Sequence, residues 1–283
     1  MATLRAIRAR IAAVRKTQQV TKAMHMVAAA KLRRTQARTV QFRAYSETIK
    51  EMVKRLFSFD ISHPFIAQRE PKRVLIVLIS SDKGLCGAYN SLLFQKVQKL
   101  CDRLIDQDLT ISFVVIGEKA LEFVRRKGYN LKESFVRFFE PLDENKAEEL
   151  IHMLIKEFLS QKQDRIYIIY QRFENVLRQI VEEKVFLPVS FPDKEKIETE
   201  PLFEPSLKEA VNTFLSLYLK ITFFQILYDA YTSEQAARMR AMDMATQNAE
   251  EMVNKLTLQF NKARQESITK ELMDIIGGSE ALR

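Results

Sequence analysis

The placement of glycine and proline constrains this chain more than any other feature. Its 283 residues include six glycines and seven prolines, where average usage of about 7% and 5% would give roughly 34 in total. Eleven of the 13 lie between residues 64 and 205, and residues 1–63 and 206–276 contain neither type. An uninterrupted helix over the second flank would run about 105 Å. This placement excludes collagen-like, low-complexity and turn-dense all-β folds. It predicts a long helix at each end, and a helix over the second flank would be longer than any single globular domain.

Apolar residues in both flanks recur at alternating steps of three and four, which is typical of a coiled coil. Twelve of 15 such positions are apolar or aromatic in the C-terminal flank, and ten of 16 in the N-terminal flank. An isolated amphipathic helix leaves its apolar stripe in water, so we expect the flanks to pack on each other as an antiparallel, left-handed coiled coil. Two helices within a globular bundle are the alternative, which the length of the flanks disfavours.

The two predicted seams can be given residue by residue. The N-terminal seam comprises Leu4, Ile7, Ile11, Val14, Gln18, Thr21, His25, Ala28, Leu32, Thr35, Thr39, Phe42, Ser46, Ile49, Val53 and Leu56. The C-terminal seam comprises Phe214, Leu217, Ile221, Phe224, Tyr228, Tyr231, Gln235, Arg238, Met242, Ala245, Ala249, Met252, Leu256, Gln259 and Ala263. We expect the second helix to end near Gly277-Gly278.

The middle of the chain predicts a compact α/β domain. Runs rich in β-branched residues, without clean alternation, indicate strands buried on both faces; they cover residues 73–80, 110–116 and 165–170. Helices are expected at 90–106, 118–127 and 144–161, a loop or strand near 131–139, and an edge strand near 179–187. The fold class is therefore a Rossmann-like α/β domain with a mostly parallel sheet (residues 64–205), inserted between coiled-coil helices at residues 1–60 and 206–283.

Charge and cysteine content limit the class of protein. The net charge is +9, of which residues 1–55 carry +12, residues 56–208 carry −1 and residues 209–283 carry −2. Two cysteines, Cys86 and Cys101, are too few for a disulfide scaffold and suit a reducing compartment. No run approaches the 18 or so apolar residues of a membrane span, and the N-terminus lacks the apolar core of a secretory signal. We expect an intracellular protein, soluble or peripheral to a membrane.

The segment Ser80–Asn90 is the most enzyme-like stretch, because it places a glycine-containing turn after a strand and before a helix. Phosphate can bind at such a helix N-terminus, but the segment lacks both the Walker spacing and the three-glycine dinucleotide pattern. No histidine is spaced to activate Cys86 as a nucleophile, and no Cys/His spacing fits zinc. We therefore expect no catalytic, cofactor or metal site, and a structural turn is the favoured interpretation.

The basic N-terminal helix leaves two further function classes open. Its cations form a stripe that could contact nucleic-acid phosphates, but no reader motif is present and aromatic residues are almost absent before Phe42. A basic coiled-coil scaffold, whose charged face is solvated or lies against an acidic protein, is the other alternative.

Five segments, in three regions of the chain, carry a resemblance to a known family. They are residues 7–11 and 17–31 near the start (IRARI and TQQVTKAMHMVAAAK), SDKGLCG at 81–87, and SEQAARM at 233–239 with NKARQESITKELMDIIG at 261–277 near the end. The chain resembles the gamma subunit of F-type ATP synthase, along its whole length. The resemblance implies a non-catalytic rotor subunit of the central stalk, which couples proton-driven rotation of a membrane ring to conformational changes in the catalytic subunits.

The resemblance also implies partners and a location. Its partners would be the alpha and beta subunits of the catalytic hexamer, the epsilon subunit and the ring of c subunits, with no nucleic acid and only indirect membrane contact. Met1 leads directly into the helix without a transit peptide, which favours the cytoplasmic face of a bacterial plasma (inner) membrane. No cofactor is expected.

Twelve residues match family segments that contact the alpha/beta hexamer. Lys262, Arg264 and Gln265 would engage a beta-subunit loop through polar contacts. The tail would sit in an apolar bearing through Ile268, Leu272, Ile275 and Ile276. Near the other end, the residues that would face the hexamer are Arg8, Arg10, Lys22, Met24 and Met26.

Overall fold

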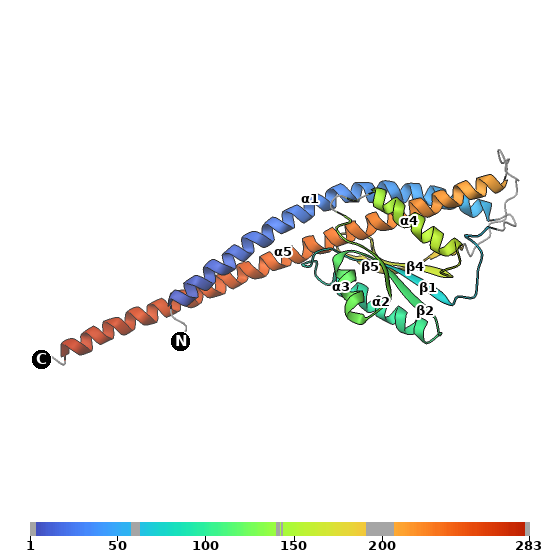
Figure 1. Cartoon of the computed structure of the whole chain (residues 1–283). Coiled ribbons are helices and arrows are strands. Elements are labelled where there is room, and N and C mark those ends of the chain that lie inside the picture. Colours follow the sequence, from blue (N-terminus) through green and yellow to red (C-terminus); the bar gives the residue numbers. More distant parts are fainter. Residues whose placement is uncertain (1–3, 58–62, 140–141, 143, 191–206, 281–283) are drawn as a thin grey trace. The chain divides into compact units, whose positions relative to one another are not determined.

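The computed structural model describes residues 4–57, 63–139, 142, 144–190 and 207–280, without the side chains of residues 274 and 277–280. Along the chain, one long helix comes first and another comes last, and strands alternate with shorter helices between them (Figure 1). The elements in chain order are α1 (Leu4–Leu56), β1 (Arg73–Ile79), α2 (Tyr89–Ile105), β2 (Thr110–Ile116), α3 (Glu118–Lys127), β3 (Leu131–Phe135), α4 (Glu144–Leu159), β4 (Arg165–Phe173), β5 (Gln179–Leu187) and α5 (Leu207–Glu280).

Contacts divide the chain into two compact units. Residues 30–237 form the first, called the sheet unit here; residues 1–29 and 238–283 form the second, called the shaft unit. Both long helices contribute to both units, because α1 has 53 residues and α5 has 74. The domain boundaries expected from the sequence, at residues 60–64 and 205–206, stay a prediction.

The sheet has five strands in the order β3-β2-β1-β4-β5. The β1 strand pairs in parallel with β2 and β4, β2 pairs in parallel with β3, and β5 joins the edge antiparallel to β4. The mostly parallel Rossmann-like sheet is therefore confirmed, including its edge strand. The segment expected as a loop or strand near 131–139 is the short strand β3, and β4 runs three residues beyond its predicted end because its extension pairs with β5.

The central strands β1, β2 and β4 are buried on both faces because helices cover both faces of the sheet (Figure 1), whereas the edge strands β3 and β5 are only partly buried. Alternate residues of β1 point to opposite sides: Val74, Ile76 and Leu78 pack with α2 and α3, whereas Leu75, Val77 and Ile79 pack with α4 and the long helices. A strand with two buried faces gains from an apolar residue at every position. This explains the unbroken run of apolar residues in the sequence from 74 to 79.

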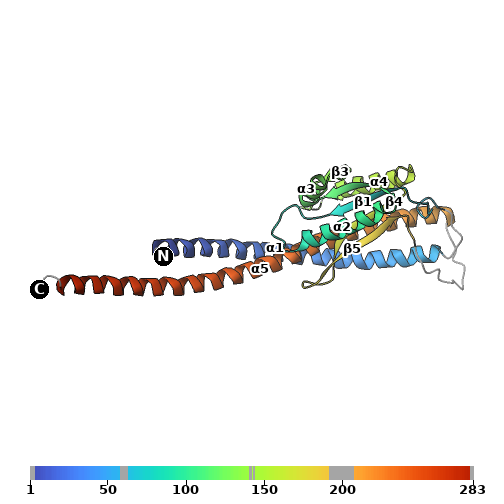
Figure 2. The same ribbon diagram turned by 90° about the horizontal axis from the view of Figure 1, so that it is seen from below.

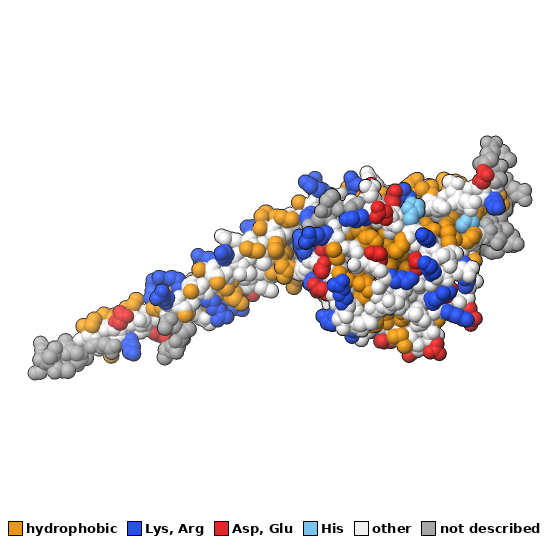
Figure 3. Space-filling view, in the orientation of Figure 1, with side chains coloured by type: hydrophobic (Ala, Val, Ile, Leu, Met, Phe, Trp, Pro, Cys, Tyr) orange, Lys and Arg blue, Asp and Glu red, His pale blue; other side chains and the backbone are white. Residues whose placement is uncertain are grey.

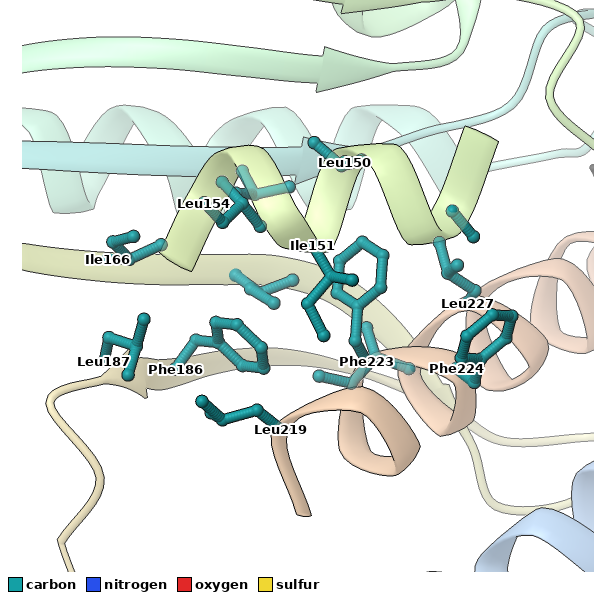
Figure 4. Packing of buried hydrophobic residues seen from close by; sticks show 14 of the residues in the cluster. Leu150, Ile151, Leu154, Ile166, Phe186, Leu187, Leu219, Phe223, Phe224 and Leu227 are labelled. Atoms are coloured by element: carbon teal, nitrogen blue, oxygen red, sulfur yellow. The ribbon is translucent and has the colours of Figure 1, made fainter. Parts of the chain in front are cut away.

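The second of these faces fixes the long helix α5 to the sheet. Figure 4 shows α4, β4 and β5 converging on α5, with Ile151 of α4 beside Phe223 of α5. Phe223 is fully buried, and its ring centroid lies 5.9 Å from that of Phe186 on β5. Each such side chain adds about 2 kcal/mol of burial free energy. This part of α5 therefore forms part of the core of the sheet unit.

Within the sheet unit, α1 and α5 run antiparallel, side by side in both ribbon views (Figures 1 and 2). The ring of Phe42 stacks on that of Tyr228 with centroids 4.8 Å apart, and the hydroxyls of Thr39 and Thr232 are 2.8 Å apart. Lower numbers on one helix meet higher numbers on the other, as an antiparallel pair requires. The two long terminal helices predicted from the sequence are thus confirmed, whereas the left-handed supercoil stays a prediction.

The predicted seams can be compared with the burial of each side chain. Every one of the 16 seam positions of α1 is buried or half-buried, and so is every seam position of α5 up to Ala249. Beyond it Leu256 is buried and Ala263 half-buried as predicted, but two positions are wrong: Met252 and Gln259 are exposed, and Val253 and Phe260 take their places. Residues 246, 253 and 260 lie seven apart, which keeps them on the same side of the helix. The sequence left the choice open because residues 252 and 253 are both apolar.

The end of α5 also differs from the expectation. The helix continues through Gly277 and Gly278 to Glu280. Glycine costs about 1 kcal/mol relative to alanine in a helix, which weakens the helix without forbidding it.

Candidate functional site

The candidate site is the surface of the shaft unit, whose two helices hold each other through a narrow seam. The hydroxyls of Thr21 and Thr246 are 2.8 Å apart, and the guanidinium of Arg8 lies 5.3 Å from the ring centroid of Phe260. The buried side chains between the helices are small or medium-sized, such as Ala28 and Val253. A seam this narrow leaves most of each helix surface accessible, and Lys and Arg side chains are spread along it (Figure 3).

The five predicted contact residues of α1 are all exposed. Met24 and Met26 are 40% and 57% exposed, although methionine is normally a core residue. Lys22, between the seam residues Thr21 and His25, is also exposed, as are Arg8 and Arg10. Arg8 differs from the others because its guanidinium also packs on Phe260 of the partner helix.

The seven predicted contact residues of α5 are exposed as well. Lys262, Arg264 and Gln265 lie where α5 passes the beginning of α1, because the contact of Arg8 with Phe260 sets the register of the pair. From there α5 extends beyond the N-terminal end of α1 (Figures 1 and 2).

The extended part of α5 exposes an apolar surface. Ile268, Leu272, Ile275 and Ile276 are 49%, 55%, 69% and 56% exposed. Met273, 64% exposed, belongs to the same surface and was not predicted from the sequence, although its place between Leu272 and Ile275 is a usable signal. Contiguous exposed apolar surface on a soluble protein marks an interaction site. The structure thus gathers all twelve predicted residues on one unit: a group of cations and methionines on α1, a polar group on α5 and the apolar tail of α5.

The segment Ser80–Asn90 uses its polar groups to hold its own loop. The Asn90 amide donates to Ser81 Oγ at 2.7 Å and to the sulfur of buried Cys86 at 3.3 Å. Asp82 Oδ1 accepts from the backbone N–H of Glu118 and of Arg137, at 3.2 and 2.9 Å. These hydrogen bonds tie the side chains of Ser81, Asp82 and Asn90 to the loop itself and to the start of α3, which supports the structural interpretation.

The usual ligand position of this sheet topology is also occupied by the protein. Ligands of open α/β sheets bind beyond the carboxyl ends of the strands, where the chain reverses its direction of winding. Here that point lies between β1 and β4. Gln171 of β4 donates to the carbonyl of Tyr89 at 2.6 Å, and the Tyr89 hydroxyl donates to the carbonyl of Ala230 in α5 at 3.1 Å. Helix α5 thus lies where a nucleotide would otherwise bind.

The structure contains a buried ion pair that was not predicted from the sequence. The Asp229 carboxylate, fully buried, lies 2.7 Å from the guanidinium of Arg43, which also donates to the carbonyl of Phe173 at 2.8 Å. Burial raises the pKa of Asp229 to about 6, against the opposing effect of Arg43. The available signal was a single acidic residue in the apolar run from Ile221 to Tyr231. The pair joins α1, α5 and β4.

Two other kinds of site can be assessed for the described residues. Among them, no three His, Cys, Asp or Glu side chains gather as metal ligands would. One helical segment, Leu207–Met273, is long and apolar enough to cross a membrane by composition, but half of its most apolar window is buried inside the protein. Core helices of soluble proteins share this property, and here Figure 4 shows α5 packed on the sheet.

Comparisons with known proteins agree with this geometry. The ATP synthase family model matches residues 3–282. The ATP synthase gamma chains of Chloroherpeton thalassium and Syntrophus aciditrophicus are 38% and 40% identical to this chain, over 100% of it and 99% of each relative.

Solved structures show the same fold. A chain of the Euglena gracilis mitochondrial ATP synthase matches with a TM-score of 0.75 at 22% identity, covering 99% of this chain and 94% of its own length. A chain of the central stalk and c-ring structure of Tetrahymena thermophila mitochondrial ATP synthase matches with a TM-score of 0.62 at 26% identity, covering 80% and 99%. The exposed helix pair, the sheet unit and these full-length relatives together place the chain in the ATP synthase gamma chain family.

Proposed function

We propose that this chain is the central-stalk rotor subunit of a proton-translocating F-type ATP synthase. In this role it performs no catalysis; it couples ion-driven rotation of the c-ring to conformational changes in the catalytic beta subunits. Its partners are the alpha/beta hexamer, the epsilon subunit and the c-ring, at the cytoplasmic face of a bacterial inner membrane. The observation that carries the proposal is the exposure of all twelve predicted contact residues on the shaft unit.

The coupling follows from differential binding. A ligand shifts a conformational equilibrium only by the difference in its affinity for the two states. A helix pair with different residues on each side presents different contacts to three equivalent beta subunits. Polar residues such as Arg264 and Gln265 form charge-assisted hydrogen bonds that depend on angle. Rotation therefore changes which beta subunit is favoured in which state.

The apolar tail has a different physical role. Hydrophobic contact is non-directional and scales with the area removed from water. Ile268, Leu272 and Ile275 can therefore stay covered by a surrounding apolar collar at every angle. The tail keeps the shaft centred in the collar, whereas the contacts of the polar residues change with the rotation angle of the shaft.

The test is the double variant Arg264→Ala with Gln265→Ala in the reconstituted complex. Both side chains are exposed, so we expect unchanged folding of the chain. We expect coupled ATP synthesis to fall at least about tenfold, because each charge-assisted hydrogen bond contributes about 1.5–3 kcal/mol. The measurement is the rate of proton-driven ATP synthesis in vesicles.

A matched control uses the same residue types in the sheet unit. Arg126→Ala with Gln107→Ala removes two exposed side chains outside the shaft unit and should leave the rate unchanged. Equal rates for the two double variants would contradict the role assigned to Arg264 and Gln265.

A further inference from the structure

A hollow of about 540 Å³ lies in the sheet unit, and none of the twelve predicted contact residues lines it. It is bounded by α1, by α5, and by Phe139, Leu142 and the first residue of α4. Its lining residues are Lys31, Arg34, Thr35, Arg38, Phe139, Leu142, Glu144, Tyr228 and Tyr231. Its size suits a small molecule rather than a single ion.

Three cations form one wall of the hollow. Lys31, Arg34 and Arg38 lie three and four residues apart, so they share one face of α1 over about 10 Å. The Arg38 guanidinium donates to the Tyr228 hydroxyl at 3.1 Å and lies 3.6 Å from the Glu144 carboxylate. Both partners also line the hollow, so they hold the Arg38 guanidinium at its wall, while the Arg38 side chain stays 61% exposed.

The floor is aromatic and rigid. The ring of Phe139 stacks on that of Tyr231 with centroids 5.2 Å apart and an angle of 5°, and both residues are at least nine-tenths buried. The Tyr228 ring is held from behind by Phe42. A fixed apolar floor lowers the local dielectric constant, which strengthens any ion pair formed above it.

The charge balance of the described lining favours an anion, with three cations against the single carboxylate of Glu144. Glu140 and Asp143 neighbour the lining in sequence and lie outside the described residues, so the full chain with both present is the sample to measure. A row of three cations fits several linked anionic groups better than one. We propose that this hollow binds a polyphosphate anion, supplied either as a nucleoside polyphosphate or as inorganic polyphosphate.

The test is calorimetric titration of the full chain with inorganic tripolyphosphate and, separately, with ATP. We expect binding at or below millimolar concentration that weakens with salt. Arg34→Gln should weaken it about tenfold, because a charge-assisted contact is lost. Glu144→Gln should strengthen it, because a like charge leaves the hollow. Equal affinity for the two ligands assigns the site to the phosphates alone; tighter binding of ATP assigns it to a nucleotide.

Arg33 provides the matched control. It is exposed on the same helix, one residue from Arg34, and does not line the hollow. Arg33→Gln should change the affinity less than twofold. Equal losses of affinity in the Arg34 and Arg33 variants would overturn the proposal, and so would tighter binding of an acidic peptide than of tripolyphosphate. It would also be overturned if neither ligand bound at about 1 mM in low salt, a concentration that corresponds to the weak end of specific affinities.

Discussion

Gly117 lies where β2 turns into α3, against the residue that follows β1. Its φ of +97° is one that residues with a side chain rarely adopt, and a Cβ there would lie 2.4 Å from the Ser80 carbonyl oxygen. The contact is with backbone, and Ser80 is itself fixed by hydrogen bonds to Ile116 and Ala120. Neither side can move away.

We expect Gly117→Ala to lower the free energy of unfolding by at least about 2 kcal/mol. Gly84→Ala is the control, because a Cβ at Gly84 would meet nothing within 4 Å. Chemical denaturation of both variants measures the difference. Similar unfolding midpoints would contradict the strain assigned to Gly117.

Asp229 makes stability depend on pH. Its pKa is raised from 3.8 to about 6 by burial, so the folded protein holds a proton that the unfolded chain releases. The group's contribution to stability is therefore fully present below pH 4 and is lost as the pH rises through about 6. Over that window the loss is roughly 3 kcal/mol, at about 1.4 kcal/mol per pH unit.

Asp229→Asn removes this titration. Besides Arg43 on α1, the charged groups that act on Asp229 include Arg172 on β4 and Glu182 and Lys184 on β5, and they remain in the variant. We expect the unfolding free energy of the wild type to fall relative to the variant between pH 4 and pH 7. A constant difference across this range would show that Asp229 titrates normally.

The seam of the shaft unit gives a prediction about helix register. Val253 is 8% exposed and Met252 is 46% exposed, although the sequence pattern favoured Met252 as the seam residue. Val253→Ala should lower the local opening free energy of this helix pair by about 1–2 kcal/mol, since two buried methyl groups are lost. Met252→Ala should change it by less than about 0.5 kcal/mol. Hydrogen exchange of residues 246–260 measures the opening free energy in both variants. A larger loss for Met252→Ala than for Val253→Ala would show that Met252, and not Val253, is the seam residue.

At the scale of the whole molecule, we expect the exposed tail to be needed for assembly but not for folding. Removing residues 264–283 deletes described side chains that are exposed apart from half-buried Ser267, so the melting temperature should change by no more than about 2 °C. The same deletion removes the apolar tail, and we expect co-purification with an ATPase-active alpha/beta hexamer to be lost. A shortened chain that still assembles and couples would contradict the role proposed for the tail.

The sequence by itself determined the two long helices, the order of strands and helices, and the surface that carries the candidate site. These follow from local rules: glycine and proline interrupt helices, apolar residues repeat every 3.5 positions along a seam, and strands buried on both faces are continuously apolar. The resemblance of the segments at 7–31 and 261–277 to a known family then predicted twelve contact residues on those helices, where side chains outside a narrow seam are exposed.

Only the tertiary structure decided the register of α5 beyond Ala249, the pairing of Arg43 with Asp229 and the hollow beside Arg34. Met252 and Val253 are both apolar, and the choice between them depends on which face meets α1 at Thr21 and Arg8. Arg43 and Asp229 are 186 residues apart in the chain. Local sequence preferences carry no information on such distant contacts, because packing between elements selects one arrangement among several that each segment allows.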